Sequence, residues 1–166
     1  MAEDETRGRD QLLFFLKYQR DSVLAIVDGL AEEHWQTSVV PSGWTVAGMI
    51  EHLGHAERHW FQQVVNGHEV ELPWDEGRPE YDPNAPLVCQ RPAADVRAYY
   101  EEQCRRSDEV LKGVPLSHRP KGRHGGAEVT NVRNVVLHMI EETAAHSGHL
   151  EIARELLDGR TGLGLR

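Results

Sequence analysis

One short segment near the end of the chain carries four side chains of the types that bind metal ions. Within residues 138–159, HMIEETAAHSGHLEIARELLDG, they are His138, Glu142, His146 and His149. Residues four apart on an α-helix differ by about 40° in direction, so a helix over this segment would place all four within an arc of about 80°. Such a face is either a metal site or a solvated surface on which Glu142 and His146 form an i, i+4 pair.

A second segment also gathers imidazole groups. Residues 41–67, PSGWTVAGMIEHLGHAERHWFQQVVNG, contain His52, His55 and His59, which a helix would place within about 60° of one another. Buried imidazole and carboxylate groups cost free energy unless they are paired or bound to a metal, so two facing clusters favour a metal site more than either cluster alone. The spacing leaves open which of the three histidines would join, and an isolated HxxxH pair such as His55 and His59 is a weak motif.

The ligand set that these segments offer is two imidazoles and one carboxylate. Three protein ligands leave coordination positions of a metal ion open, which is a property of catalytic rather than structural sites. A zinc-like cation in such a site polarises a carbonyl group or lowers the pKa of a bound water molecule or thiol. Metal-dependent hydrolysis and thiol transfer both fit this chemistry, and the sequence singles out no catalytic acid or base.

Four helices are predicted to position these side chains. Their expected extents are residues 10–30, Thr45 to the stop signal Asn66-Gly67, Pro92 to Lys112, and Thr130 to Asp158-Gly159. Thr45 and Thr130 are the expected N-caps. Residues 67–91 contain four prolines and little periodicity, which predicts a long crossing connection. The fold class is therefore predicted to be all-α, a four-helix bundle with one long crossover connection.

Two further expectations concern side chains outside the histidine segments. Trp44 and Trp60 are expected to pack in the core, as aromatic residues on apolar stripes usually do. Arg154, which stands between Glu151 and Glu155, is expected on a solvated face. The glycine-rich residues 115–129 are expected to form a loop, and no β-hairpin is anticipated.

Composition restricts the class of protein. The chain has 166 residues, 39% of them hydrophobic, which predicts one globular domain over residues 1–166. A formal net charge of −9 without a basic stripe argues against nucleic acid as a partner. The charged N-terminus and the lack of a long apolar run predict a cytoplasmic protein that does not enter a membrane. Cys89 and Cys104 are expected to be unpaired thiols.

Three features together resemble the DinB-like (YfiT-like) superfamily of metal-binding four-helix proteins. They are residues 41–61, PSGWTVAGMIEHLGHAERHWF, residues 135–162, VVLHMIEETAAHSGHLEIARELLDGRTG, and the helix order with its long second connection. The family takes one metal ligand from an HL pair in the second helix and two from a HxxxHxGQ form in the fourth. Glu142 stands at the first histidine of that form, His146 at the second and His149 at the glutamine.

A glutamate at the first ligand position is similar to the bundle domain of mycothiol-dependent maleylpyruvate isomerase. The resemblance therefore implies a metal site of His52, Glu142 and His146, with His52 chosen because His52-Leu53 matches the HL pair. His55 and His59 become outer or surface residues. His138 would orient a ligand by hydrogen bonding or pack as a core histidine, and His149 would line the open side of the metal or be exposed.

The resemblance implies a metal-dependent enzyme that acts with a small-molecule thiol such as mycothiol or bacillithiol. The expected activity is that of a thiol S-transferase, with a metal-dependent hydrolase or a non-catalytic, stress-associated metal-binding module as alternatives. Zinc is the expected divalent metal, with nickel, manganese and iron as alternatives. Isomerase activity itself is not expected, because no second domain follows GRTGLGLR. The family also suggests a homodimer.

Overall fold

The computed structural model describes residues 2–69, 82 and 84–162. Most of the predicted crossover connection, including three of its four prolines, lies outside the described residues. Among the described residues, no helix has the length and apolar content needed to cross a membrane.

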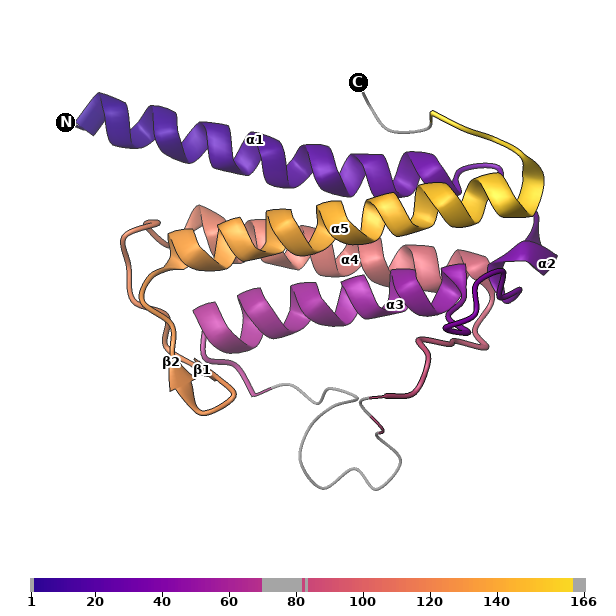
Figure 1. The fold of residues 1–166 in the computed structure, drawn as a ribbon. Helices are drawn as coiled ribbons and strands as arrows, with labels where there is room; N and C mark the ends of the chain where they lie inside the picture. Colours follow the sequence, from indigo (N-terminus) through magenta and orange to yellow (C-terminus); the bar gives the residue numbers. More distant parts are fainter. Residues whose placement is uncertain (1, 70–81, 83, 163–166) are drawn as a thin grey trace.

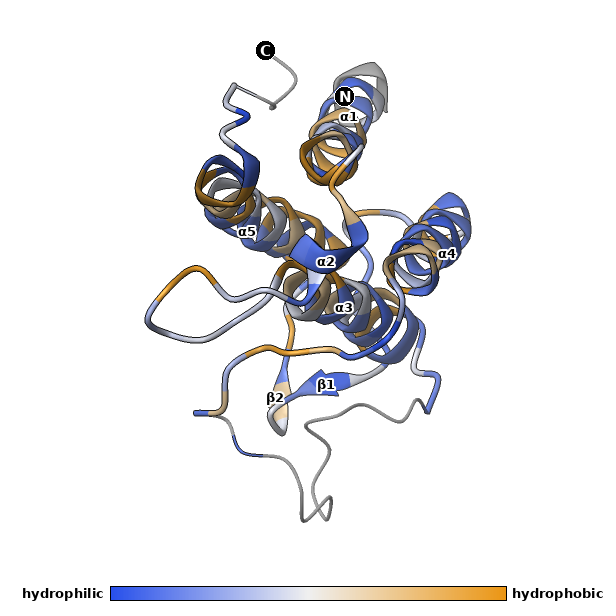
Figure 2. Cartoon of the chain, turned by 90° about the vertical axis from the view of Figure 1, so that its right-hand side faces the viewer, coloured by the Kyte–Doolittle hydropathy of each residue, from blue (hydrophilic) through white to orange (hydrophobic). Residues whose placement is uncertain are grey.

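Four long helical stretches make up most of the described chain. They are α1 (Ala2–Val27), α3 (Val46–Glu57) with its π-helical continuation η1 (Arg58–Val65), α4 (Ala93–Lys112) and α5 (Val132–Asp158). α1 packs mainly against α5, and α3 packs mainly against α4 and also contacts α5 (Figure 1). Viewed end-on in Figure 2, the four helices lie around a common centre. The predicted all-α helical bundle is confirmed.

Buried apolar side chains fill the bundle in two clusters. One brings α1, α2, α3, α4 and α5 together around Ile50 and Tyr100, and the other joins α1, η1, α4 and α5 and the end of α3 around Phe61 and Met139. Each fully buried side chain of this size stabilises the fold by about 1.5–3 kcal/mol. The three- and four-residue apolar period therefore specifies which side of each helix turns inward.

The helix ends differ from the prediction where the sequence has no apolar periodicity to mark them. α1 begins at Ala2 rather than residue 10, because charged residues extend a helix without adding to its apolar stripe, and it ends at Val27 rather than residue 30. Gly29 follows with a φ of +67°, a conformation that favours glycine. α4 begins at Ala93, and Pro92 is its N-cap instead of its first-turn residue.

The N-cap of the second helix is confirmed and that of the last helix is displaced by one residue. Thr45 Oγ1 accepts a hydrogen bond from the Gly48 N–H at 3.1 Å. On α5 the cap is Asn131, not Thr130, and its side-chain oxygen accepts from the Asn134 N–H at 3.0 Å. Asn caps somewhat better than Thr, so this adjacent residue takes the position.

One short helix and one hairpin of two strands were not anticipated. α2 (Glu32–Trp35) is a single turn that buries Trp35. β1 (Arg123–His124) and β2 (Ala127–Glu128) form an antiparallel hairpin, so the expectation of no hairpin was wrong. Gly125 and Gly126 both have positive φ, +53° and +76°, as the tight turn of such a hairpin requires. The strands are too short to show apolar alternation, which is the signal that predicts a strand.

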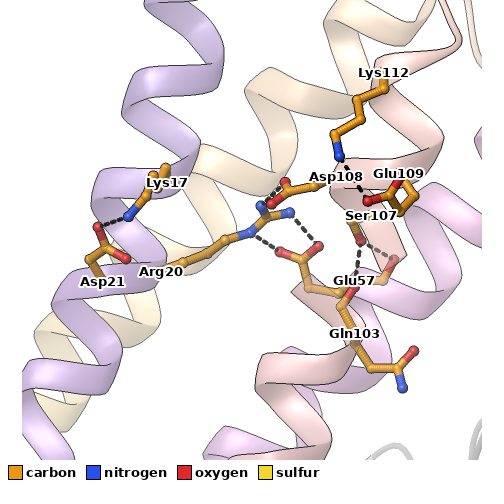
Figure 3. A network of polar contacts seen from close by, with 9 residues as sticks. All are labelled: Lys17, Arg20, Asp21, Glu57, Gln103, Ser107, Asp108, Glu109 and Lys112. Atoms are coloured by element: carbon orange, nitrogen blue, oxygen red, sulfur yellow. Dashed lines mark hydrogen bonds and ion pairs between the residues drawn. The ribbon is translucent and has the colours of Figure 1, made fainter. Parts of the chain in front are cut away.

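A buried ion pair fixes α1 and α4 to the end of α3 (Figure 3). The Arg20 guanidinium donates to the two Glu57 carboxylate oxygens at 2.7 and 2.6 Å and to Asp108 Oδ1 at 2.8 Å. A bidentate arginine–carboxylate pair sets the orientation of both partners. Because Glu57 is the last residue of α3, this pair holds the helix where it changes to the π-helical segment.

Arg154 is buried, with 2% of its surface exposed, so the prediction of a solvated face was wrong. Its Nη1 donates to the backbone oxygens of Ile26 at 2.7 Å and Asp28 at 3.0 Å, and its Nε donates to Asp158 at 2.8 Å. Carbonyl groups at a helix C-terminus lack partners within the helix and attract cations. Arg154 thereby joins α5 to the end of α1.

Candidate metal centre

His52, Glu142 and His146 converge between α3 and α5. One ligand atom from each lies within 4.8 Å of the other two, and no other group of three His, Cys, Asp or Glu residues meets this condition in the described part of the chain. Glu142 Oε1 lies 3.0 Å from His52 Nε2 and 3.1 Å from His146 Nε2. The two imidazole rings are nearly perpendicular, with centroids 5.1 Å apart. The residues implied by the resemblance are thus brought together.

Helix geometry explains this convergence. Glu142 and His146 are one turn apart on α5 and therefore face the same side, and the capped start of α3 brings His52 opposite them. Gly54 allows α3 to approach α4, because a Cβ atom there would lie 2.6 Å from the Tyr99 ring. α3 thus packs closely on α4 on one side and contacts α5 on the side that carries His52.

Hydrogen bonding keeps the Glu142 carboxylate charged. Bonds from His146 and then from His52 hold the pKa of the Glu142 carboxyl well below its usual range, although partial burial opposes this. In the metal-free protein both Nε2 atoms donate to this carboxylate. Replacing those protons by a cation would give two nitrogen ligands and one oxygen ligand, the donor set that borderline divalent metals accept.

The three side chains are partly accessible. His52, Glu142 and His146 expose 24%, 25% and 18% of their side-chain surfaces. A structural metal site is normally closed by its fourth ligand, whereas a catalytic site keeps a position for substrate. The cluster therefore has the accessibility that a small-molecule substrate needs.

His149 extends the cluster toward solvent. It is exposed, and its Nδ1 lies 3.4 Å from His146 Nδ1, on the side of that ring opposite Glu142. The Trp44 ring follows, its centroid 6.3 Å from that of His149. Trp44 is only partly buried, and it packs on the edge of the core as well as facing this histidine.

The remaining histidines of the two segments lie elsewhere. His55 Nδ1 lies 2.7 Å from the Tyr99 hydroxyl of α4, and burial lowers the pKa of His55 to about 4. His138 packs on Trp60 with ring centroids 4.4 Å apart. Neither histidine belongs to the group of His52, Glu142 and His146. The histidines that spacing placed on one face of each helix therefore have different partners in the structure.

His59 belongs to a separate cluster that the sequence did not reveal. Its Nε2 lies 2.9 Å from Nδ1 of His124, which comes from the unanticipated hairpin. The Trp60 ring, predicted to be core, is partly exposed and lies against both His124 and His138. The dipeptide Gly125-Gly126 was the only signal for this arrangement, because it marks a two-residue turn directly after His124.

A helical bundle whose second and last long helices share a His, Glu, His cluster defines a DinB-like protein, as the resemblance predicted. Comparison with known families is more specific. The family described as mycothiol-S-transferase matches residues 11–159, which is most of the chain, and the chain belongs to that family. A separate search among curated proteins found no match.

Proposed function

We propose that this protein is a metal-dependent mycothiol S-transferase that joins the sulfur of mycothiol to an electrophilic small molecule. Family membership supports mycothiol as the thiol substrate and transfer of its sulfur as the reaction. The observation that carries the metal dependence is the convergence of His52 Nε2 and His146 Nε2 on one oxygen of Glu142. These three residues are the proposed ligands of a divalent cation, with zinc proposed first and nickel, manganese or iron as alternatives.

A cation held by these residues would lower the pKa of a thiol that enters an open position and keep it as a nucleophilic thiolate. The protein's own groups prepare that position. The ionised Glu142 supplies one negative charge against the two charges of the cation. Before a cation binds, its contacts with His52 and His146 set the direction of each ring. His149 lies against the far nitrogen of His146 and contributes to the orientation of that ligand.

The proposed transfer balances without another reagent. The thiol loses its proton to solvent, and the sulfur electron pair forms a bond to the electrophilic carbon. A leaving group departs with the electrons of its own bond, or an activated double bond accepts them and then a proton. No oxidant or reductant is needed, and no side chain is assigned as the general base.

The test combines metal content with turnover. Purified protein, its metal-free form and the variants His52→Ala, Glu142→Ala and His146→Ala would be assayed for bound zinc and for conjugation of monochlorobimane to mycothiol, bacillithiol and glutathione. About one cation per chain and zinc-dependent conjugation with mycothiol are expected, and each variant should lose most of both. His118→Ala is the matched control, because it removes an exposed histidine outside the cluster.

A cobalt-substituted protein separates thiol transfer from hydrolysis. Mycothiol ligation should add a sulfur-to-metal charge-transfer band in the near ultraviolet, and Glu142→Gln should change or abolish it. The proposal would be wrong if saturating mycothiol left the spectrum unchanged or if all three ligand variants kept their metal. Thiol-independent cleavage of an ester or amide would instead support the hydrolase interpretation.

Three expectations about the whole molecule remain predictions: one domain over residues 1–166, a cytoplasmic location and a homodimer. Phe14 and Phe15 on α1 expose 63% and 51% of their surfaces and pack edge to face with each other. Apolar side chains at this exposure are consistent with an interface but occur singly on monomers too. Light scattering at several concentrations tests the dimer, and a monomer at every concentration would contradict it.

A further inference from the structure

His59 and His124 bring two imidazole nitrogens to one point outside the proposed catalytic centre. His59 Nε2 and His124 Nδ1 are 2.9 Å apart, and the residues come from η1 and β1. At this distance one nitrogen carries a proton and the other offers a lone pair. A metal cation can take the place of that shared proton, since both nitrogens are metal ligands once deprotonated.

The second nitrogen of His59 is already fixed as metal-bound histidines require. His59 Nδ1 lies 2.6 Å from the Gln63 side-chain oxygen, which can only accept, so Nδ1 donates its proton there. This leaves Nε2 as the nitrogen directed at His124. Metal-binding histidines almost always donate their other N–H to an oxygen in this way, because the bond fixes both the tautomer and the ring orientation.

The hairpin is attached so that His124 stays over His59. The backbone N–H groups of Lys121 and Gly122 donate to the oxygens of Val65 and Val64 at 3.2 and 2.8 Å. Only glycine fits at position 122, because a Cβ atom there would lie 2.4 Å from the Gln63 backbone oxygen. The Trp60 ring lies against the His124 ring, with centroids 4.5 Å apart and an interplanar angle of 30°.

The charges nearest in sequence to His124 have partners of their own. Lys121 Nζ donates to Asn66 Oδ1 at 3.2 Å, Arg123 Nε donates to the Gly126 oxygen at 2.9 Å, and Arg119 pairs with Glu128. The Arg119 charge is neutralised by Glu128, and the head groups of Lys121 and Arg123 bond to neutral oxygens. The net charge of −9 on the whole chain favours the approach of cations.

We propose that His59 and His124 form a second metal site, which takes a cation with high affinity for imidazole nitrogen, such as Cu²⁺ or Ni²⁺. Two nitrogen ligands at about 2.0–2.1 Å from one metal ion are about 2.9–3.3 Å apart. The hydrogen-bonded nitrogens, 2.9 Å apart, therefore need only a small rotation of the rings to bind one ion together. On binding, the shared proton moves to the outward Nε2 of His124 or to solvent, and water fills the remaining positions. The site shares no residue with His52, Glu142 and His146.

The experiment measures copper in a chain whose first site has been damaged. His146→Ala protein would be compared with His146→Ala/His124→Asn and with His146→Ala/His118→Asn. His124 is exposed and Asn can still hydrogen bond to His59, so the fold should survive, which circular dichroism would verify. His118 is the matched control because it is an exposed histidine on the same connection.

The His146→Ala protein should bind Cu²⁺ with electron paramagnetic resonance couplings from two nitrogens, and copper should quench Trp60 fluorescence. His124→Asn should weaken binding at least about tenfold and remove one nitrogen coupling, and Gln63→Ala should weaken binding about 10–100-fold. Trp60→Phe should remove the quenching while leaving the bound copper unchanged. His118→Asn should alter none of these.

Equal copper binding with and without His124, or equal losses in the His118 and His124 variants, would show adventitious surface binding and overturn the proposal. The proposed transferase centre is tested separately, because its failure would appear as unchanged zinc content in His146→Ala. The copper result at His59 and His124 and the zinc result at His146 are therefore independent of each other.

Discussion

Two glutamates occupy similar places between helices of the bundle but have different partners. Glu57 is completely buried and its carboxylate is held by the Arg20 guanidinium, whereas Glu142 is one quarter exposed and accepts from two imidazoles. Arginine keeps its proton at any pH a protein tolerates, so Arg20 cannot exchange that proton for a metal ion. Imidazole can exchange a proton for a metal ion, so the two histidines beside Glu142 can hold either protons or a cation. The identity of the cationic partner thus separates a structural carboxylate from a candidate functional one.

The largest expected effect is on the free energy of unfolding of the metal-free protein. Glu57→Gln should destabilise it by about 3–5 kcal/mol, because the buried Arg20 is left with only the exposed Asp108 carboxylate as its opposite charge. Glu142→Gln should cost about 1 kcal/mol, because its partners are partly solvated. Urea denaturation of the two isosteric variants makes the comparison. Equal losses would show that both carboxylates are structural.

Zinc should stabilise the folded protein through Glu142 and not through Glu57. Zinc at about 100 times its dissociation constant should add about 2.7 kcal/mol, or about 5–10 °C in Tm for a chain of this length. Glu142→Gln should abolish most of this shift, and Asp108→Asn, which alters the other cluster, should preserve it. Thermal unfolding with and without zinc supplies the measurement. A full zinc shift in Glu142→Gln would remove that residue from the proposed ligand set.

The pH dependence of His55 gives an intermediate effect close to the candidate centre. Burial depresses the pKa of His55 from 6.5 to about 4, so between these values the unfolded chain binds the proton more tightly than the folded chain. The contribution of His55 to the free energy of unfolding is therefore fully present above pH 6.5. It falls as the pH drops toward 4, by about 1–3 kcal/mol in total.

His55→Gln removes this titration while keeping a polar partner for the Tyr99 hydroxyl. Between pH 7.5 and pH 4, measured without metal, the wild type should therefore lose about 1–3 kcal/mol more stability than the variant. A difference that stays constant over this range would show that His55 does not gain its proton on unfolding.

The sequence predicted those parts of the molecule that depend on helical periodicity. The apolar pattern gave the bundle, and helix spacing alone placed Glu142 and His146 together. It did not choose among His52, His55 and His59, because that choice depends on where α3 becomes π-helical and on which helix each side chain meets. Only the HL match favoured His52.

Contacts between segments far apart in the chain were not predictable in this way. Arg154 has charged sequence neighbours, and its burial depends on two carbonyl groups, at the end of α1 and just after it, that are more than 100 residues away. His124 meets His59 only because Gly122 permits two backbones to touch. Such contacts carry no periodic signal, so the second histidine pair became apparent only in the three-dimensional arrangement.

The smallest expected effect compares the two carboxylates that share Arg20. Glu57 exposes none of its side chain and Asp108 exposes 59%, although both accept from the same guanidinium at 2.6–2.8 Å. Water screens the exposed pair and competes for its hydrogen bonds, so Asp108→Asn should cost less than about 1 kcal/mol and less still at high salt. Urea denaturation at two salt concentrations provides the test. A loss as large as that of Glu57→Gln would mean that contact geometry, rather than burial, determines the strength of these ion pairs.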